Sequence, residues 1–168
     1  MAKPQFLIIA GPIGSGKSSF AEQFSVLFKA PAVDVEAIRY DLKRKPDYSE
    51  VEGKLAHKVA LIMLRTFMTS GYPLLAVGGE TFAERQKWRS MAERAGYQTT
   101  VVWLQVDKPT LKRRFAERMK DEKLAPDVFI SAMKEVELPE PQEKVVYVSG
   151  KHIFSTQVRS VLEKLASK

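Results

Sequence analysis

The chain has 168 residues, of which 45% are hydrophobic, and it carries a net charge of +7 at pH 7. This length corresponds to one ordinary domain, so we expect residues 1–168 to form a single domain. Because the sequence contains no cysteine, disulfides and thiolate metal sites are excluded. The two histidines, His57 and His152, lack a metal-binding spacing, so we expect any bound metal to have oxygen ligands.

The surplus of positive charge suits an anionic ligand, but by itself it does not distinguish a nucleotide from a nucleic acid. No apolar run approaches the ~20 residues needed to cross a bilayer. Residues 1–5 lead directly into the first apolar run, without the pattern of a targeting segment. We therefore expect a cytoplasmic protein that does not associate with membranes.

Apolar runs alternate with amphipathic segments along the chain, which predicts an α/β fold built on a parallel sheet. The expected strands are Gln5–Ala10, Ala32–Val35, Pro73–Val77, Thr99–Val106 and Val145–Val148. The expected helices are Lys17–Lys29, Glu50–Ser70, Ala83–Ala95, Pro109–Lys120, Pro126–Glu137 and Thr156–Ala166. The first and fourth strands are nearly continuous apolar runs, as strands buried on both faces require. Trp88 and Trp103 fall in these patterns as core residues.

A glycine-rich segment follows the first expected strand and precedes a helical pattern. Its spacing, G-x-x-x-x-G-K-S, predicts a phosphate-binding loop, because glycines let the backbone N–H groups wrap a polyphosphate. Lys17 would reach the β- and γ-phosphates, and the Ser18 hydroxyl would ligate Mg²⁺. The alternative is a glycine-rich turn with a chance Lys-Ser pair, but the strand and helix are both in place. We predict that ATP or GTP, with Mg²⁺, binds Gly11, Pro12, Ile13, Gly14, Ser15, Gly16, Lys17, Ser18 and Ser19.

Ligands of parallel sheets collect beyond the carboxyl ends of the strands, so we expect the reacting residues in the loops there. After the second expected strand, Asp34, Glu36 and Arg39 lie at the start of a helical turn. A carboxylate here could accept the proton of an attacking hydroxyl, while Arg39 fixes the acceptor or the carboxylate. The alternative is a solvated helix cap and a weak surface ion pair.

The third such loop contains Gly78, Gly79, Glu80 and Thr81 after a buried strand. Glu80 could hold a Mg²⁺-bound water, and Thr81 could contact a phosphate or the acceptor. The same residues also suit a tight turn followed by a capping box, in which Thr81 caps the next helix and Glu84 completes the pair. The two interpretations are compatible.

A basic segment, Lys112–Lys120, follows the fourth expected strand. Arg114 and Arg118 are four residues apart, so on a helix they would share a face and could close over a triphosphate. A break at 124–126 would let residues 109–137 move as a lid that excludes water. The alternative is a solvated basic face, the usual fate of a charge run.

Together these motifs resemble the small P-loop kinases related to the kinase domain of phage polynucleotide kinase, to zeta toxin and to chloramphenicol phosphotransferase. The matching positions, in chain order, are the phosphate loop, Glu36 with Arg39, Gly71, Glu80-Thr81, Pro109, and Arg114 with Arg118. The resemblance implies a three-layer α/β/α P-loop NTPase fold with a five-stranded parallel sheet and a helical lid. It also implies transfer of the γ-phosphoryl group to a hydroxyl.

The same resemblance implies that Glu36 is the general base, Arg39 its partner on the acceptor side, and Arg114 and Arg118 the lid arginines. The family usually has Asp at the position of Glu36, so Asp34 is a rival base. Its third loop often carries Asp, where this chain has glycines before Glu80.

Two classes of function are consistent with these residues. One is a kinase that phosphorylates a hydroxyl of a small molecule, a nucleotide or a polynucleotide end. The other is a nucleotide-binding regulatory module that hydrolyses slowly or not at all. The acid-plus-Arg loop and the basic lid favour the kinase, because a switch needs no acceptor base. For His57 we expect a structural or acceptor-pocket role.

Overall fold

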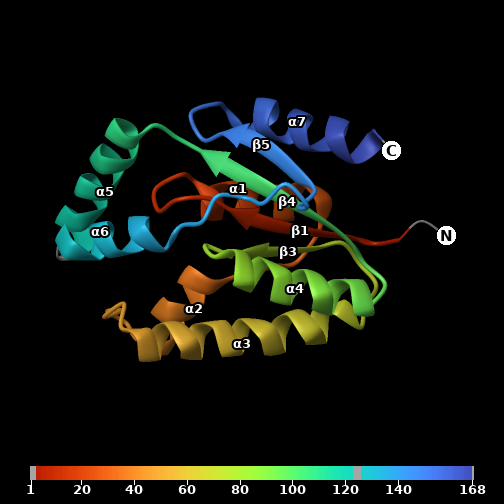
Figure 1. The fold of residues 1–168 in the computed structure, drawn as a ribbon, viewed down its shortest axis with the longest axis horizontal. Helices are drawn as coiled ribbons and strands as arrows, with labels where there is room; N and C mark the ends of the chain where they lie inside the picture. Colours follow the sequence, from red (N-terminus) through yellow and green to blue (C-terminus); the bar gives the residue numbers. More distant parts are fainter. Residues whose placement is uncertain (1–2, 123–125, 168) are drawn as a thin grey trace.

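The structure is a computed structural model that describes residues 3–122 and 126–167. Strands and helices alternate along nearly the whole chain (Figure 1). The strands are β1 (Gln5–Ala10), β2 (Ala32–Asp34), β3 (Leu74–Val77), β4 (Gln98–Gln105) and β5 (Val145–Ser149). The helices are α1 (Lys17–Phe28), α2 (Val35–Leu42), α3 (Glu50–Met68), α4 (Phe82–Arg94), α5 (Lys108–Glu122), α6 (Pro126–Glu135) and α7 (Phe154–Ala166).

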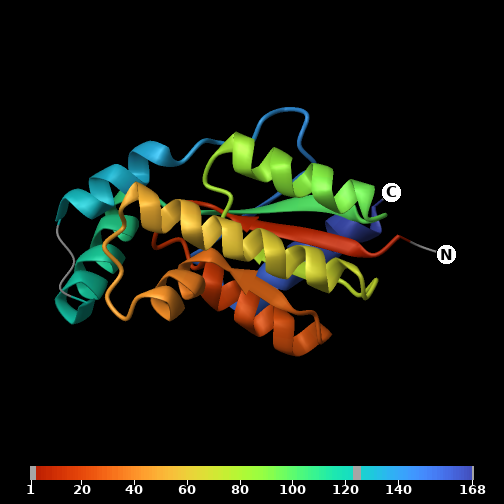
Figure 2. The ribbon, with the colours of Figure 1, turned by 90° about the horizontal axis from the view of Figure 1, so that it is seen from below.

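The described residues form a five-stranded sheet in the order β2-β3-β1-β4-β5, and neighbouring strands are parallel. Helices α1 and α7 pack on one face through a cluster that includes Phe20, Phe24 and Val161. Helices α2, α3 and α4 pack on the other through a cluster that includes Leu64 and Trp88. Figure 2 shows α3 and α4 lying over the sheet. The predicted three-layer α/β/α fold with five parallel strands is therefore confirmed.

The side chains of β1 alternate between the two clusters: Phe6 and Ile8 enter one, and Leu7 and Ile9 enter the other. All four are almost fully buried, which explains the continuous apolar run in the sequence. Trp103 lies in the core, as expected for a strand residue in this position. The sheet therefore holds the loops at its carboxyl end on a rigid, buried base.

The main difference from the expected elements lies around Asp34. The sequence suggested a strand through Val35, whereas β2 ends at Asp34 and a full helix, α2, begins at Val35. The Asp34 carboxylate causes this change, because it accepts hydrogen bonds from the backbone N–H groups of Glu36 and Ala37 and so caps the helix. The sequence also predicted a break in the chain at 124–126; its first two residues, Leu124 and Ala125, lie outside the described residues.

Helices α5 and α6 extend beyond the carboxyl ends of the strands, on the left of Figure 1. The loop after β1 leads to α1 on one face of the sheet, and the loop after β3 leads to α4 on the other. Since β1 and β3 are neighbours, a crevice opens between these two loops. Within the described residues, no helix has both the length and the apolar character needed to span a bilayer.

A buried arginine connects this crevice to the rest of the fold. Arg85 on α4 is fully buried and forms a two-point ion pair with Glu143, at 2.9 and 3.1 Å. Its remaining N–H groups donate to the carbonyls of Gly79, Glu137 and Leu138, at 2.9, 3.1 and 3.2 Å. One side chain therefore joins the loop after β3 to the connection between α6 and β5.

We predict that Arg85→Met destabilises the protein by about 3–5 kcal/mol, because it leaves the Glu143 carboxylate buried without its partner. The matched control is Arg89→Met on the same helix, where the Arg89–Glu93 pair is exposed and screened by water. That change should cost less than about 1 kcal/mol. Urea unfolding of both variants measures the difference, and equal losses would contradict the role of Arg85.

Candidate active site

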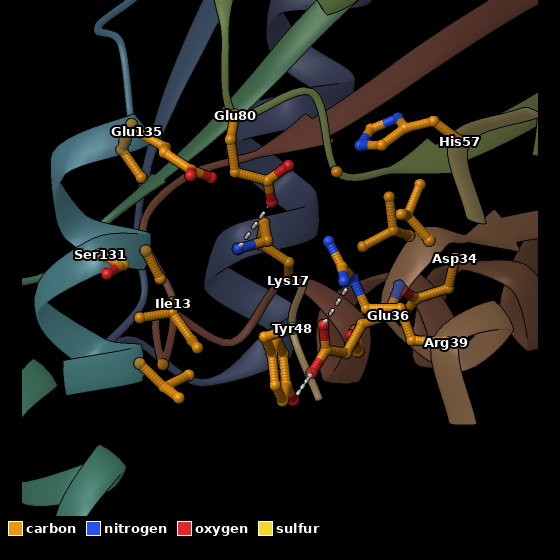
Figure 3. A pocket seen from close by; sticks show the side chains of 18 of the residues that line it. Ile13, Lys17, Asp34, Glu36, Arg39, Tyr48, His57, Glu80, Ser131 and Glu135 are labelled. Carbon is orange, nitrogen blue, oxygen red and sulfur yellow. Dashed lines mark hydrogen bonds and ion pairs between the residues drawn. The ribbon is translucent and has the colours of Figure 1, made fainter. Parts of the chain in front are cut away.

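A cavity of about 450 Å³ lies in this crevice, at the carboxyl ends of the strands. Figure 3 shows its side chains converging from the loop after β1, from α2 and α3, from the loop after β3 and from α6. This volume is typical of a pocket for a small ligand. The predicted residues Ile13, Gly14, Gly16, Lys17, Ser18, Ser19, Asp34, Glu36, Arg39, Glu80 and Arg118 all line it.

The glycine-rich loop has a backbone shape that other residues could not adopt. Gly11 has a φ of 144°, and a Cβ atom there would overlap the carbonyl oxygen of Leu104. Gly16 caps α1 with a φ of 98°, and within the described residues no side chain hydrogen-bonds to this helix N-terminus. The first N–H groups of α1 therefore face the cavity side without a side-chain cap, as an anion-binding helix terminus requires.

The Lys17 ammonium lies between the two loops that border the crevice. Its Nζ donates to the carbonyls of Gly11 and Pro12, at 2.7 and 3.1 Å, and lies 3.7 Å from Oε1 of Glu80. Figure 3 shows Lys17 and Glu80 pointing toward each other. A cation that rests on loop carbonyls is well placed to exchange these contacts for phosphate oxygens.

The residues around Lys17 fit a magnesium-bound nucleotide. Ser18 is exposed at the start of α1, so its hydroxyl is accessible, and Glu80 offers a carboxylate across the crevice. Both are the hard oxygen donors that Mg²⁺ prefers. One ligand atom from each of His57, Glu80 and Glu84 also lies within 4.8 Å of the others.

Glu84 has a structural role beside the cavity. It forms the expected capping box with Thr81 at the start of α4. It also lies 2.9 Å from Nε2 of His57. Burial opposes ionisation of Glu84, but hydrogen bonding and charge from His57 and the backbone N–H of Thr81 outweigh it and lower the pKa of the carboxyl. His57 thus borders the pocket and holds a carboxylate there.

Glu36 is the centre of a second cluster on the opposite wall. Its Oε1 accepts hydrogen bonds from the hydroxyl of Tyr48 and from Nη2 of Arg118, each at 2.6 Å. Its Oε2 lies 4.0 Å from Nε of Arg39. Burial, followed by the charge of Glu36, raises the pKa of the Tyr48 hydroxyl above its ordinary value. Tyr48 therefore remains a hydrogen-bond donor to this carboxylate.

Arg39 is held from behind by a buried carboxylate. Its Nη1 donates to Oε1 of Glu52 at 2.9 Å, and Oε2 of Glu52 accepts from the backbone N–H of Asp47 at 2.7 Å. Gly53 lets the guanidinium approach closely, because a Cβ atom there would lie 3.0 Å from Nη2. Tyr48, between these groups, has a left-handed φ of 54°, an unusual conformation for an aromatic residue.

The two predicted carboxylates differ in position. Asp34 caps α2 through Oδ1, at 2.9 Å from the N–H of Glu36. Glu36 instead extends its carboxylate to Tyr48 and Arg118. Both line the cavity, but the hydrogen bonds of Asp34 are made to the backbone of its own helix.

The two predicted lid arginines lie on α5 but contact different parts of the site. Arg114 donates to the carbonyls of Gly14 and Gly150, both at 3.0 Å, and so joins the glycine-rich loop to the end of β5. Arg118 reaches Glu36 and donates to the hydroxyl of Tyr40 at 2.9 Å. Among the described residues, Arg118 lines the cavity and Arg114 does not. In this conformation the two arginines therefore contact different segments, and their closing over a triphosphate stays a prediction.

Several residues of the site carried no recognisable signal in the sequence, namely Tyr40, Tyr48, Arg85, Ser131, Glu135, Glu143 and Gly150. Glu52 could have been found, since Ser49 and Glu52 have the spacing of a helix start, and Ser49 does cap α3. Gly150 lies against Ser15, and a Cβ there would overlap the Ser15 carbonyl oxygen. Contacts such as Gly150 with Ser15 and Arg85 with Glu143 join segments far apart in the chain, so no local sequence pattern predicts them.

Known proteins resemble the chain in sequence pattern and in fold. Residues 6–139 match the family model described as AAA domain. A gluconokinase from Sinorhizobium meliloti has 17% sequence identity and a TM-score of 0.71, over 99% of this chain and 94% of that one. The APS kinase of Mycobacterium tuberculosis, in complex with AMPPNP and APS, has 14% identity and a TM-score of 0.73, over 99% and 100%.

Kti12 from Chaetomium thermophilum, in complex with ADP-AlF3, has 12% identity and a TM-score of 0.73, over 96% of this chain and 100% of that one. No curated protein sequence is similar enough to count as a relative. At these identities the solved structures establish the fold. The resemblance to small P-loop kinases that the motifs indicated is therefore confirmed in family and fold.

We predict that Lys17→Ala abolishes most nucleotide binding and leaves the fold intact, because the polar partners of its ammonium among the described residues are two loop carbonyls and Glu80. Mg·ATP at about 100 times its Kd should stabilise the parent protein by about 2.7 kcal/mol. Thermal melts with and without nucleotide should show almost no stabilisation of the variant. Lys54→Ala, on the exposed face of α3, is the control and should respond like the parent. Equal stabilisation of Lys17→Ala and parent would contradict the assignment.

Proposed function

Because the chain belongs to the AAA domain family, we propose that it is a kinase that transfers the γ-phosphoryl group of ATP or GTP to a hydroxyl of an acceptor. One observation carries the proposal: the glycine-rich loop and the carboxylate of Glu36 line the same cavity. A phosphate donor and a base for the acceptor would therefore meet in one cavity. A nucleotide switch has no need of such a base.

The glycine-rich loop and Lys17 would bind the phosphates, with the N-terminus of α1 behind them. Ser18 and Glu80 are the residues that would hold Mg²⁺, directly or through a water. When bound, Mg²⁺ would offset charge on the β- and γ-phosphate oxygens. The position of Lys17 between Gly11 and Glu80 supports this arrangement, because phosphate oxygens can replace the carbonyl contacts that it now makes.

Glu36 is the proposed base. The acceptor hydroxyl would donate its proton to Glu36 while its oxygen forms a bond to the γ-phosphorus, and the bond from that phosphorus to the bridging oxygen would break to release ADP or GDP. Oε1 of Glu36 already accepts two hydrogen bonds, so Oε2 is the freer oxygen for this proton. Arg39, 4.0 Å from Oε2, would orient the carboxylate.

We assign residues 109–137 the role of a lid over this cavity. Arg118 on α5 and Ser131 on α6 line the cavity from that side, so movement of these helices would open or close it. Closure would exclude water, which competes with the acceptor for the γ-phosphoryl group. The segment after α6 is bonded to the Glu80 loop through Glu137 and Arg85, which would anchor one end of the lid.

The proposal is tested by incubating the protein with Mg²⁺ and γ-labelled ATP or GTP, with and without a panel of hydroxyl-bearing acceptors. Label should move to an acceptor faster than to water. Release of labelled phosphate alone, at a rate that no acceptor changes, would favour the nucleotide-binding regulatory module instead. Lys17→Ala serves as the inactive control.

We predict that Glu36→Gln lowers turnover by about 10²–10⁴, because the amide keeps the shape and the hydrogen bonds of the side chain but loses its basicity. Nucleotide affinity should change little. Asp34→Asn should have a milder effect, since Asn also caps helices and the start of α2 is retained. The reverse order would give the role of base to Asp34, and full activity in both variants would exclude acid–base catalysis by either residue.

We predict that Arg118→Ala lowers turnover by about 10³ or more with little change in nucleotide affinity. The guanidinium would stabilise charge on the transferring group, or hold Glu36 in place, and both roles act on the rate. Arg118→Lys should restore little activity, because a compact ammonium on a shorter side chain does not reproduce the planar, delocalised guanidinium that would face the transferring group. Arg113→Ala, on the exposed face of α5, is the control. Normal turnover of Arg118→Ala would contradict a catalytic role and indicate that Arg118 belongs to a solvated basic face of α5.

A further inference from the structure

The walls of the cavity carry far more negative than positive charge. Among the described residues that line it, seven are acidic and three are Lys or Arg. The acidic residues are Asp34, Glu36, Asp47, Glu80, Glu84, Asp127 and Glu135, and the basic ones are Lys17, Arg39 and Arg118. This balance is opposite to that of the whole chain, which has a net charge of +7. Asp47 is paired with Lys43, and Glu84 lies against His57, so the acidic surplus rests mainly on Asp34, Asp127 and Glu135. The ligand that enters beside the nucleotide therefore meets an acidic surface.

Each of the three basic side chains already has a carboxylate partner. Arg39 pairs with Glu52 at 2.9 Å, and Arg118 pairs with Glu36 at 2.6 Å. Lys17 lies 3.7 Å from Glu80 and is needed for the phosphates of the nucleotide. The charge of each cation is thus matched by a carboxylate, so among the described residues of the walls no cation is reserved for an anionic acceptor.

The wall formed by α6 adds carboxylates that are not neutralised. Asp127 and Glu135 line the cavity from an exposed surface of α6 and form no ion pair within residues 3–122 and 126–167. Ser131 lies between them on the same helix, and Figure 3 shows Glu135 and Glu80 on adjoining sides of the cavity. Carboxylates accept hydrogen bonds and cannot donate them when ionised, so this wall suits a ligand rich in O–H or N–H donors.

A bound nucleotide would strengthen this preference. A triphosphate with one Mg²⁺ retains net negative charge, and its binding would engage Lys17, the cation that faces Glu80 in this structure. An anionic acceptor would then approach both the nucleotide and the carboxylates of the wall. Like charges in one cavity disfavour binding, which is how a site rejects the wrong class of ligand.

We infer that the acceptor is a small hydroxylated molecule without negative charge, and that the site rejects polynucleotide ends and phosphorylated sugars. The inference rests on the proposed kinase function and specifies its substrate class. The positive charge of the chain does not oppose it, because Lys112, Arg113 and Lys120 are exposed on α5 and do not line the cavity.

The test separates candidate acceptors by charge. A bacterial small-molecule extract is divided at pH 7 on an anion exchanger, and the unbound fraction, the bound fraction and a 5′-hydroxyl oligonucleotide are each incubated with the protein, Mg²⁺ and γ-labelled ATP or GTP. Label should enter a compound of the unbound fraction. Label in a compound of the bound fraction, or in the oligonucleotide, would overturn the inference and leave the kinase function standing.

Thermal stabilisation by AMPPNP, measured in parallel, distinguishes the two failures. If AMPPNP stabilises the protein but none of the three acceptor samples takes up label above the Lys17→Ala background, the kinase function fails and the inference fails with it. Stabilisation together with labelling of an anionic compound would overturn the inference alone.

A charge reversal on α6 then tests the wall itself with the labelled compound of the unbound fraction. Glu135→Lys should raise the KM for the acceptor about 10-fold or more, because it removes a charged hydrogen-bond acceptor, and should change the KM for the nucleotide less than twofold. Glu117→Lys, an exposed charge reversal on α5, should change neither. An unchanged acceptor KM in Glu135→Lys would overturn the role of this wall.

Discussion

The buried guanidinium of Arg85 is the interaction on which the geometry of the site depends. A charge without access to water must have its N–H groups satisfied, and here they are bonded to a carboxylate and to carbonyls from two separate segments. One of these is the loop that presents Glu80, and another is the segment that leaves α6. The position of Glu80 relative to Lys17 is thus determined from within the core, as is the attachment of the segment that leaves α6.

Glu36 shows how the opposite wall is organised around a single carboxylate. The groups that contact Glu36 come from α2, from the loop before α3 and from α5, so its position depends on all three. Arg39 and Glu52 form a second layer behind it. Since Arg118 belongs to α5, any displacement of that helix changes the hydrogen bonds of the proposed base. Covering the cavity and activating the acceptor would in this way be linked.

The sequence predicts well the parts of the molecule that depend on local order. The fold class, the strand before Gly11 and the helix that begins at Lys17 follow from apolar runs and from the glycine-rich loop motif, whose spacing fixes the backbone conformation. The capping box of Thr81 and Glu84 follows from local spacing in the same way. In contrast, Arg85 and Glu143 are 58 residues apart and Arg118 and Tyr48 are 70 apart, so only the folded chain brings them together. For the same reason the helical spacing of Arg114 and Arg118 could not reveal that they contact different segments.

Arg114 fastens the first half of α5 to the glycine-rich loop and to the end of β5. If α5 rotated about this contact, Arg118, about 6 Å farther along the helix axis, would lie close to the centre of rotation. Such a rotation of α5 would displace Arg118 slightly and the far end of the helix much more. Because Arg114 donates to the carbonyl of Gly14, a change in the glycine-rich loop on phosphate binding would change the tilt of α5. The width of the cavity opening beside α5 would then change when the nucleotide binds, before any acceptor arrives.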